Sequence, residues 1–215
     1  MTEPELEYRP GEPRPITLRR LRAVGHFSFV STIALLVISG LYWGKPYEQA
    51  WQLVLAHFAG GRAGSVGLGL RKGFDTTYLL FLNAMIDFVL MLYVYPWFVA
   101  GFRHVAGWPV IGPWLTGLRE VAYKYKPRVE PYGALGLLAF VFFPFWSTGP
   151  LVGVIVGYLI GLRTWLTFAS VVTGNLLAIA TWIWAYDRLH EYSPQAALVL
   201  LCFIFGMAAA GVIFA

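Results

Sequence analysis

The stretch GALGLLAFVFFPFWSTGPLVGVIVGYLIGL, residues 133–162, is a long apolar segment that is interrupted near its centre. A second apolar segment, RTWLTFASVVTGNLLAIATWIWAYD, follows directly as residues 163–187. A helix that breaks inside a membrane leaves backbone N–H and C=O groups that lipid cannot satisfy, so such breaks occur where protein or a water-filled cavity surrounds them. They are typical of transport and binding sites. The interrupting residues, which we take as candidate contacts of a site, are Pro144, Thr148, Gly149 and Pro150.

The composition places the chain among integral membrane proteins. Of its 215 residues, 58% are hydrophobic and only 13% are charged, whereas charged residues make up about 25% of a soluble domain. The net charge of +5 belongs to the loops, where it influences orientation and contacts with anionic lipid rather than binding of nucleic acid. Cys202 is the only cysteine, so the chain can form no intrachain disulfide. We expect a cytoplasmic N-terminal tail (1–23) and a single polytopic membrane domain (24–215).

Four stretches have the length of about 20 apolar residues that a bilayer core requires, and two others do not cross simply. The four expected spans are 24–43, 76–100, 165–186 and 194–214. The other two, 46–73 and 133–162, are glycine-rich or broken by proline, which favours re-entrant hairpins that enter and leave on one side. Basic residues before position 24 and in the loop 101–131 predict that both face the cytoplasm. The expected location is therefore the cell inner (plasma) membrane, multi-pass, with a cytoplasmic N-terminus.

A short motif occurs twice with the same surroundings. Gly69-Leu70-Arg71 lies twelve positions before Asn83 (83 − 71), and Gly161-Leu162-Arg163 lies twelve positions before Asn175 (175 − 163). The two copies are 92 positions apart (163 − 71). If each unit is a hairpin followed by one span, the second unit begins on the opposite face, which is an inverted-topology repeat. The predicted fold class is all-α integral membrane, with an inverted repeat of re-entrant hairpin plus transmembrane helix (about 46–100 and 133–186) and added first and last transmembrane helices.

Residues 129–175 resemble the C-terminal half of the small multidrug export family of prokaryotic membrane proteins. The matching positions are Tyr132, Gly133, Pro144, Thr148, Gly149, Gly153 and the run 160–162. The resemblance extends over about residues 75–190 and implies a transporter-like function, with a layout similar to that of DedA-type membrane proteins. The chain departs from the family upstream. The family has an acidic-Leu-Arg-Gly motif there, whereas this chain has LAHFAGGRAGSVG (55–67), which contains no carboxylate. That departure puts ion coupling through this hairpin in question.

Asp87 lies centrally in the second expected span, four residues after Asn83, so both side chains share one helix face. A charged carboxylate at mid-bilayer costs about 2.5–3.5 kcal/mol on insertion scales. It is therefore expected to face protein, to be paired, or to be protonated, which makes Asp87 a candidate proton carrier. The alternative is a hydrogen-bonded acid that only fixes helix packing.

The other polar residues of the apolar segments also allow two interpretations each. Asn83 and Asn175 could bind a substrate, or could hydrogen-bond across helices and hold the two halves together. Arg71 and Arg163 could bind an anionic solute or lipid, or could extend to the headgroups as interfacial side chains. The broken tip at Thr148–Pro150 could offer a hydroxyl and free N–H groups to a substrate, or could simply require small residues.

A histidine near the first span raises a rival interpretation. His26 and Gly40-Leu41 have a spacing similar to that of the first helix in b-type cytochromes of the formate dehydrogenase gamma-subunit kind. Haem needs a second axial ligand at a similar depth, and His104 is the candidate. No second helix of the cytochrome pattern is present, so we expect no cofactor. Catalytic motifs such as G-x-S-x-G, H-E-x-x-H and the P-loop are absent from the sequence, which argues against an enzyme.

These features predict a transporter-like protein that moves a small or amphipathic solute, or a lipid, through a site between two hairpins. An anionic solute is one of the options. The alternative is an accessory or structural subunit of a larger membrane complex, because the proline-rich tail and the basic stretch 101–131 could dock a partner. Expected partners are membrane lipids, with other membrane subunits or a second copy in a homodimer as further options. No metal site is expected.

Overall fold

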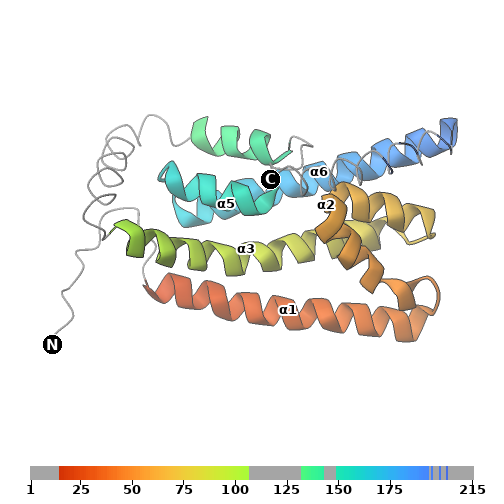
Figure 1. Ribbon diagram of the computed structural model, residues 1–215, viewed down its shortest axis with the longest axis horizontal. Coiled ribbons are helices and arrows are strands. Elements are labelled where there is room, and N and C mark those ends of the chain that lie inside the picture. Colours follow the sequence, from red (N-terminus) through yellow and green to blue (C-terminus); the bar gives the residue numbers. More distant parts are fainter. Residues whose placement is uncertain are drawn as a thin grey trace.

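The computed structural model describes residues 15–106, 132–142 and 149–193, with single positions at 195, 199 and 202. All regular structure in these residues is helical. Figure 1 shows α1, α3 and α6 as long rods, with the shorter helices packed against them. The elements are α1 (Pro15–Trp43), the 3₁₀ helix η1 (Tyr47–Gln49), α2 (Trp51–Arg71), α3 (Thr76–Ala106), the unlabelled helix Tyr132–Phe142, α5 (Pro150–Leu159) and α6 (Thr164–Tyr192).

Among the described residues, three helices are long and apolar enough to cross a membrane: Ile16–Trp43, Thr76–Phe102 and Thr164–Leu189. They coincide with the first three expected spans, so the all-α membrane class is confirmed. The fourth expected span, 194–214, lies outside the described residues apart from single positions, and most of the basic stretch 101–131 lies outside them as well.

In α1, small polar residues lie on the buried face and large apolar residues on the exposed face, which is the opposite of a helix in a soluble protein. Its buried face carries the small polar residues Ser28, Thr32 and Ser39, while Phe27 and Leu41 are more than 70% exposed. Thr32 and Ser39 donate their hydroxyl protons to carbonyl oxygens one turn earlier. Small residues at the helix contact and large apolar residues outside are typical of helices that pack within lipid.

The first helix also begins earlier than its apolar span. Residues 15–23, which we assigned to the tail, form the first turns of α1. Leu18 is buried in a cluster with Met91 and Tyr95 of α3, and this packing extends the helix beyond the strictly apolar residues.

α2 is broken in the middle by Gly61, whose φ of 64° and ψ of −168° are not helical. We call residues 51–60 the first arm and residues 62–71 the second arm. The two ends of α2 lie together, because the Lys72 ammonium donates hydrogen bonds to Gln49 Oε1 at 2.8 Å and to Gln52 Oε1. The chain therefore enters and leaves this element at the same place, and Figure 1 shows the two arms.

A second pair of short helices also runs antiparallel. A Cβ atom added at Gly153 of α5 would lie 2.6 Å from Val141, and one added at Gly157 would lie 2.4 Å from Thr167 and 3.0 Å from Leu137. Helix Tyr132–Phe142 and α5 are thus in close contact along their length. The link between them, 143–148, lies outside the described residues and includes the predicted contacts Pro144 and Thr148.

α2 and α5 end in the same hydrogen-bonded turn. Phe74 N–H donates to Gly69 O and Gly73 N–H to Leu70 O, and the same pattern recurs from Leu162 to Gly157 and from Gly161 to Tyr158. This is a Schellman motif with glycine in the left-handed conformation at C′. The φ values are 79° at Gly73 and 73° at Gly161.

The equivalent positions of these two turns are 88 residues apart (161 − 73), so the spacing of 92 expected from the Gly-Leu-Arg motif is wrong as a structural register. Gly69 lies inside α2, whereas Gly161 lies in the turn after α5. A shift of four residues is about one helical turn. The apolar pattern is nearly unchanged by such a shift, so sequence alone could not distinguish the two registers.

Gly73→Ala should lower the free energy of unfolding by about 1–2 kcal/mol, since a Cβ atom disfavours the left-handed conformation. Gly136→Ala is the matched control. It lies in the helix Tyr132–Phe142 with open space around the added Cβ and should raise stability by about 0.5–1 kcal/mol. Reversible SDS titration in mixed micelles measures both. Equal stability of the Gly73→Ala and wild-type chains would contradict the turn described here.

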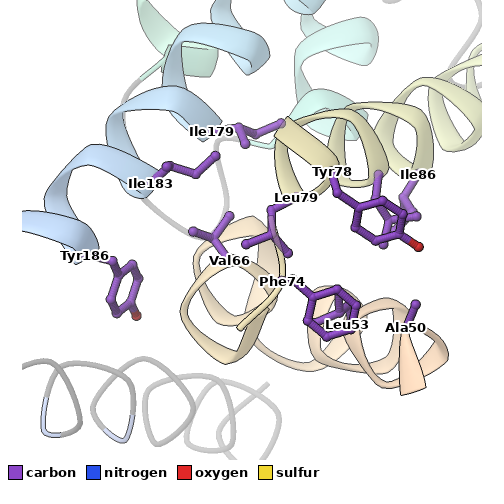
Figure 2. Close-up of a cluster of buried hydrophobic side chains, with 11 residues drawn as sticks. Ala50, Leu53, Val66, Phe74, Tyr78, Leu79, Ile86, Ile179, Ile183 and Tyr186 are labelled. Atoms are coloured by element: carbon purple, nitrogen blue, oxygen red, sulfur yellow. The ribbon is translucent and has the colours of Figure 1, made fainter. Parts of the chain in front are cut away.

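Two buried apolar clusters lie along α3 and α6. In the first, Ile179 and Ile183 of α6 face Leu79 of α3 (Figure 2). The members of this first cluster are Ala50, Leu53, Val66, Phe74, Tyr78, Leu79, Leu82, Ile86, Ile179, Ile183 and Tyr186. The members of the second cluster are Leu18, Met91, Tyr95, Val99, Leu137, Val141, Val154, Tyr158, Leu162 and Val171.

These contacts fix the direction of the two long helices. The early part of α3 packs against the late part of α6 in the first cluster, and Tyr95, late in α3, contacts Thr164 and Phe168 at the start of α6. α3 and α6 are therefore antiparallel, as their opposite colour gradients show in Figure 1. Asp87 and Asn175 fall between the two clusters along the chain.

Candidate functional site

A group of polar side chains is enclosed between the two apolar clusters, near the middle of the membrane-capable stretches of α3 and α6. Each of these side chains belongs to a residue that is at most 8% exposed. They come from both arms of α2, from α3 and from α6. The members, here called the polar network, are His57, Arg62, Asn83, Asp87 and Asn175.

Both carboxylate oxygens of Asp87 have partners. Oδ1 lies 3.0 Å from His57 Nε2, and Oδ2 accepts a hydrogen bond of 3.0 Å from Asn175 Nδ2. A buried carboxylate is tolerated when its lone pairs are satisfied and a positive charge is close. Here α2 supplies the basic ring and α6 supplies the amide, so Asp87 holds α2, α3 and α6 together.

Asn83 fixes the orientation of the His57 ring. Its Nδ2 donates to the Leu79 carbonyl at 2.8 Å, so its Oδ1 is left to accept, and His57 Nδ1 lies 2.8 Å from that oxygen. An amide oxygen cannot donate, so His57 Nδ1 carries a proton. The other ring nitrogen, Nε2, then faces Asp87.

Arg62 joins the polar network to the second pair of short helices. Its Nη1 donates to Asn175 Oδ1 and its Nη2 donates to the Val141 carbonyl, both at 2.7 Å. Val141 lies at the end of helix Tyr132–Phe142, where carbonyls lack partners within the helix. One guanidinium thus links the break in α2 to the end of another short helix and to α6.

The break at Gly61 explains how two residues of α2 reach the same place. His57 and Arg62 are five positions apart, so in an unbroken helix of 3.6 residues per turn they would point about 140° apart. The left-handed φ at Gly61, which glycine adopts without a Cβ penalty, redirects the second arm. His57 at the end of the first arm therefore contacts Asp87, and Arg62 at the start of the second arm contacts Asn175.

Comparison with known proteins identifies the chain's relatives at the level of a family. The family model described as "Putative small multi-drug export protein" matches residues 62–181, more than half of the chain. The chain belongs to this family. The matched range includes Arg62, Asn83, Asp87 and Asn175, and it begins after His57. No curated protein matches the chain, and no solved structure matches it either.

In this member of the small multi-drug export family, the structure brings some of the predicted candidate residues together and places others apart. Asp87, Asn83 and Asn175 are brought together, as described above. Arg71 and Arg163 are not part of the polar network, because they lie exposed at the end of α2 and just before α6.

The predicted contacts at the break are only partly described. Gly149 is the N-cap of α5, and Pro150 is its first residue and is buried. The predictions for Pro144 and Thr148 lie outside the described residues. Their roles stay predictions.

His57 and Arg62 are the residues that sequence reasoning missed. We noted that residues 55–67 have no carboxylate and did not consider the basic side chains of that segment as partners for buried polar groups. Charge balance could have found one of them, because Arg62 is the only lysine or arginine between positions 46 and 70. A buried carboxylate in an apolar protein needs a cation nearby.

The histidines of this family member make no haem pair among the residues described. Both ring nitrogens of His57 already have partners within 3.0 Å. His26 is exposed and donates from Nδ1 to the Arg22 carbonyl at 2.7 Å. The side chain of His104 lies outside the described residues. In the same part of the chain, no group of three or more His, Cys, Asp or Glu side chains could hold a metal ion.

Proposed function

We propose that this chain is a multi-pass transporter of the cell inner membrane, with a cytoplasmic N-terminus, that moves a small or amphipathic solute through a site at mid-depth. The observation that carries the proposal is the polar network. It places an acid, two bases and two amides between apolar clusters, where burial of polar groups is costly. Intramembrane ionisable groups that face protein are typical of ion and substrate pathways.

The arrangement of elements supports re-entrant hairpins in an inverted repeat. The ends of α2 lie together, and helix Tyr132–Phe142 with α5 forms the second antiparallel pair. Each pair leads through a Schellman turn into a long helix, and these long helices, α3 and α6, run in opposite directions. In transporters with inverted repeats, the site lies where the two halves meet, which here is the contact between Asp87 and Asn175.

The proposed mechanism is alternating exposure of this contact to the two sides of the membrane. Arg62 holds the α2 hairpin to Asn175 and to the Val141 carbonyl, so a movement of either hairpin exchanges these bonds for contacts with water or solute. Asp87 is the proton-responsive group. Loss or gain of a proton between Asp87 and His57 changes the strength of the contact between α2 and α3, and in this way couples proton movement to hairpin movement.

The solute is proposed to contact the second hairpin at its broken tip, Thr148–Pro150. The support comes from the start of α5, which is capped by Gly149 without a side-chain hydrogen bond. The first N–H groups of a helix have no partners inside the helix. The α5 start lies close to Val141 and therefore close to Arg62.

The proposal predicts solute flux linked to proton movement. Proteoliposomes that contain a trapped pH indicator are given gradients of inorganic phosphate, benzenesulfonate or methyl viologen, which cross lipid slowly by themselves. At least one of these probes should change the internal pH at least tenfold faster than in protein-free vesicles. The same vesicles with an added protonophore give the control for leaks.

An absence of any response in well-folded protein would contradict transport. Native mass spectrometry on protein extracted gently from its own membrane then distinguishes between the alternative functions. A stoichiometric set of partner subunits would favour the accessory-subunit alternative, and a mass increment of one haem would favour the cytochrome alternative.

A further inference from the structure

A groove lies at the end of α1, where the chain turns back through η1 into α2 (Figure 1). Its volume of about 560 Å³ falls in the range of about 300–1,000 Å³ that is usual for small-molecule sites. Leu36, Val37 and Leu41 of α1 line the groove together with Tyr47 of η1 and Trp51 of α2. None of these residues belongs to the polar network, so the groove is a separate feature of the molecule.

The turn that forms the groove is held by backbone hydrogen bonds. Gly44 N–H donates to Gly40 O, and Glu48 N–H donates to Gly44 O, both at 3.1 Å. Gly40 also lines the groove, and a Cβ atom added to it would lie 3.4 Å from Glu48 Cα. The end of α1 and η1 are therefore in contact, and the groove is formed without a ligand.

The groove extends past the end of the membrane-capable stretch of α1. That stretch ends at Trp43, so Leu36 and Val37 lie within it, whereas Glu48 and Trp51 come after it. Tryptophan is typical of the boundary between membrane and water, and Trp43 and Trp51 are both more than half exposed. An occupant of the groove thus has an apolar part beside lipid and a polar part at the boundary.

Glu48 supplies the charge of the groove. It is the one acidic or basic residue among those that line it, and its carboxylate has no hydrogen bond or ion pair with any described residue. Lys45 is exposed and does not line the groove, and the Lys72 ammonium donates to Gln49 and Gln52. The negative charge of Glu48 is therefore available to an occupant.

Two aromatic residues lie close to Glu48 in the chain and line the same groove, Tyr47 and Trp51. The faces of such rings attract cations, and tryptophan does so most strongly. The Tyr47 ring is held edge-on by Phe74 and Tyr78, with centroid distances of 5.1 and 4.9 Å. A carboxylate and aromatic rings beside an apolar wall are the groups that recognise an organic cation with a hydrocarbon part.

We infer that this groove binds an amphipathic cation, such as an alkylammonium. The apolar part of the cation lies against α1, and its charged head lies at Glu48 between the aromatic residues. The site goes beyond the transport proposed above and does not depend on it, because the two share no residue.

Titration calorimetry of the full chain in phosphatidylcholine nanodiscs tests the inference, with empty nanodiscs as the blank. The probes are decyltrimethylammonium and decanesulfonate, which have the same alkyl tail and head groups of opposite charge. After subtraction of the blank, decyltrimethylammonium should bind at least about tenfold more tightly than decanesulfonate, because the carboxylate and the aromatic rings both favour the cation.

Two variants assign the binding to the groove. Glu48→Gln keeps the shape of the side chain and removes its charge, and it should weaken binding of decyltrimethylammonium about fivefold. Trp51→Leu should weaken this binding about two- to fivefold through loss of the ring. The matched controls, Glu191→Gln and Trp165→Leu, change exposed residues outside the groove and should leave binding unchanged. All four positions are exposed, so the variants are expected to fold.

The outcomes separate this inference from the proposed function. Cation-selective binding that Glu48→Gln weakens supports the inference, even where proteoliposomes show no flux. Equal affinity for the two probes overturns it and indicates a groove that takes lipid tails irrespective of charge. Cation binding that neither Glu48→Gln nor Trp51→Leu weakens also overturns it. These titrations measure binding alone, so their failure leaves the proposed transport to the flux measurement.

Discussion

Asp87→Asn abolishes flux driven by a pH gradient and leaves the protein folded: that is the result we expect in proteoliposomes. Asparagine has the shape of aspartate and fits the same contacts. Its Oδ1 can accept from Asn175 Nδ2, and its Nδ2 can donate to His57 Nε2, while His57 Nδ1 still donates to Asn83. All hydrogen bonds are satisfied without the exchangeable proton. The pH-driven rate should therefore fall to that of protein-free vesicles.

The stability of the same variant is the control. If Asp87→Asn transports normally under a pH gradient but unfolds more easily, then Asp87 serves helix packing and the proton role is wrong. If expression and thermal stability in detergent stay close to those of the wild-type chain while the pH-driven flux disappears, the carboxylate acts in coupling.

Arg62→Leu should destabilise the protein by about 2–5 kcal/mol, since each buried acceptor that loses its donor costs about 1–3 kcal/mol. The substitution leaves Asn175 Oδ1 and the Val141 carbonyl without the donors that they have now. It also removes the positive charge nearest to the buried Asp87 apart from His57. Reversible SDS titration measures the change in the free energy of unfolding.

Arg71→Leu is the matched control, an exposed arginine at the end of the same helix. Most surface substitutions change stability by less than about 0.5 kcal/mol. Similar losses for Arg62→Leu and Arg71→Leu would contradict the buried role that we assign to Arg62.

The class of fold was predictable from hydropathy because lipid imposes it on each segment separately. The spans of α1, α3 and α6 follow from about 20 apolar residues in a row. The shared face of Asn83 and Asp87 followed from helical spacing alone. These predictions needed no knowledge of how segments meet.

The partners of Asp87 were not predictable in the same way. His57 reaches Asp87, and Arg62 reaches Asn175, only because Gly61 takes a left-handed φ. The sequence of a glycine-rich segment with a Gly-Gly pair does not show which glycine will break the helix. The pairing with Asn175 depends on the register of α3 against α6. The Gly-Leu-Arg motif aligns the two halves of the sequence one helical turn away from the alignment given by the two turns. It therefore matched Asn175 with Asn83 instead of with Asp87.

In the inverted repeat that we propose, the 88-residue spacing of the two turns also makes Asp87 equivalent to Asn175 (175 − 87), and these two residues are in contact. A dimer of two identical short chains with the same twofold arrangement would have to place the same residue at both positions. Two aspartates there would repel each other, and two asparagines would hold no charge. One chain that carries both halves escapes this restriction, because each position can change by itself. Within the proposed repeat, the acid–amide pair therefore breaks the symmetry between the two halves, as a single chain that carries both halves allows.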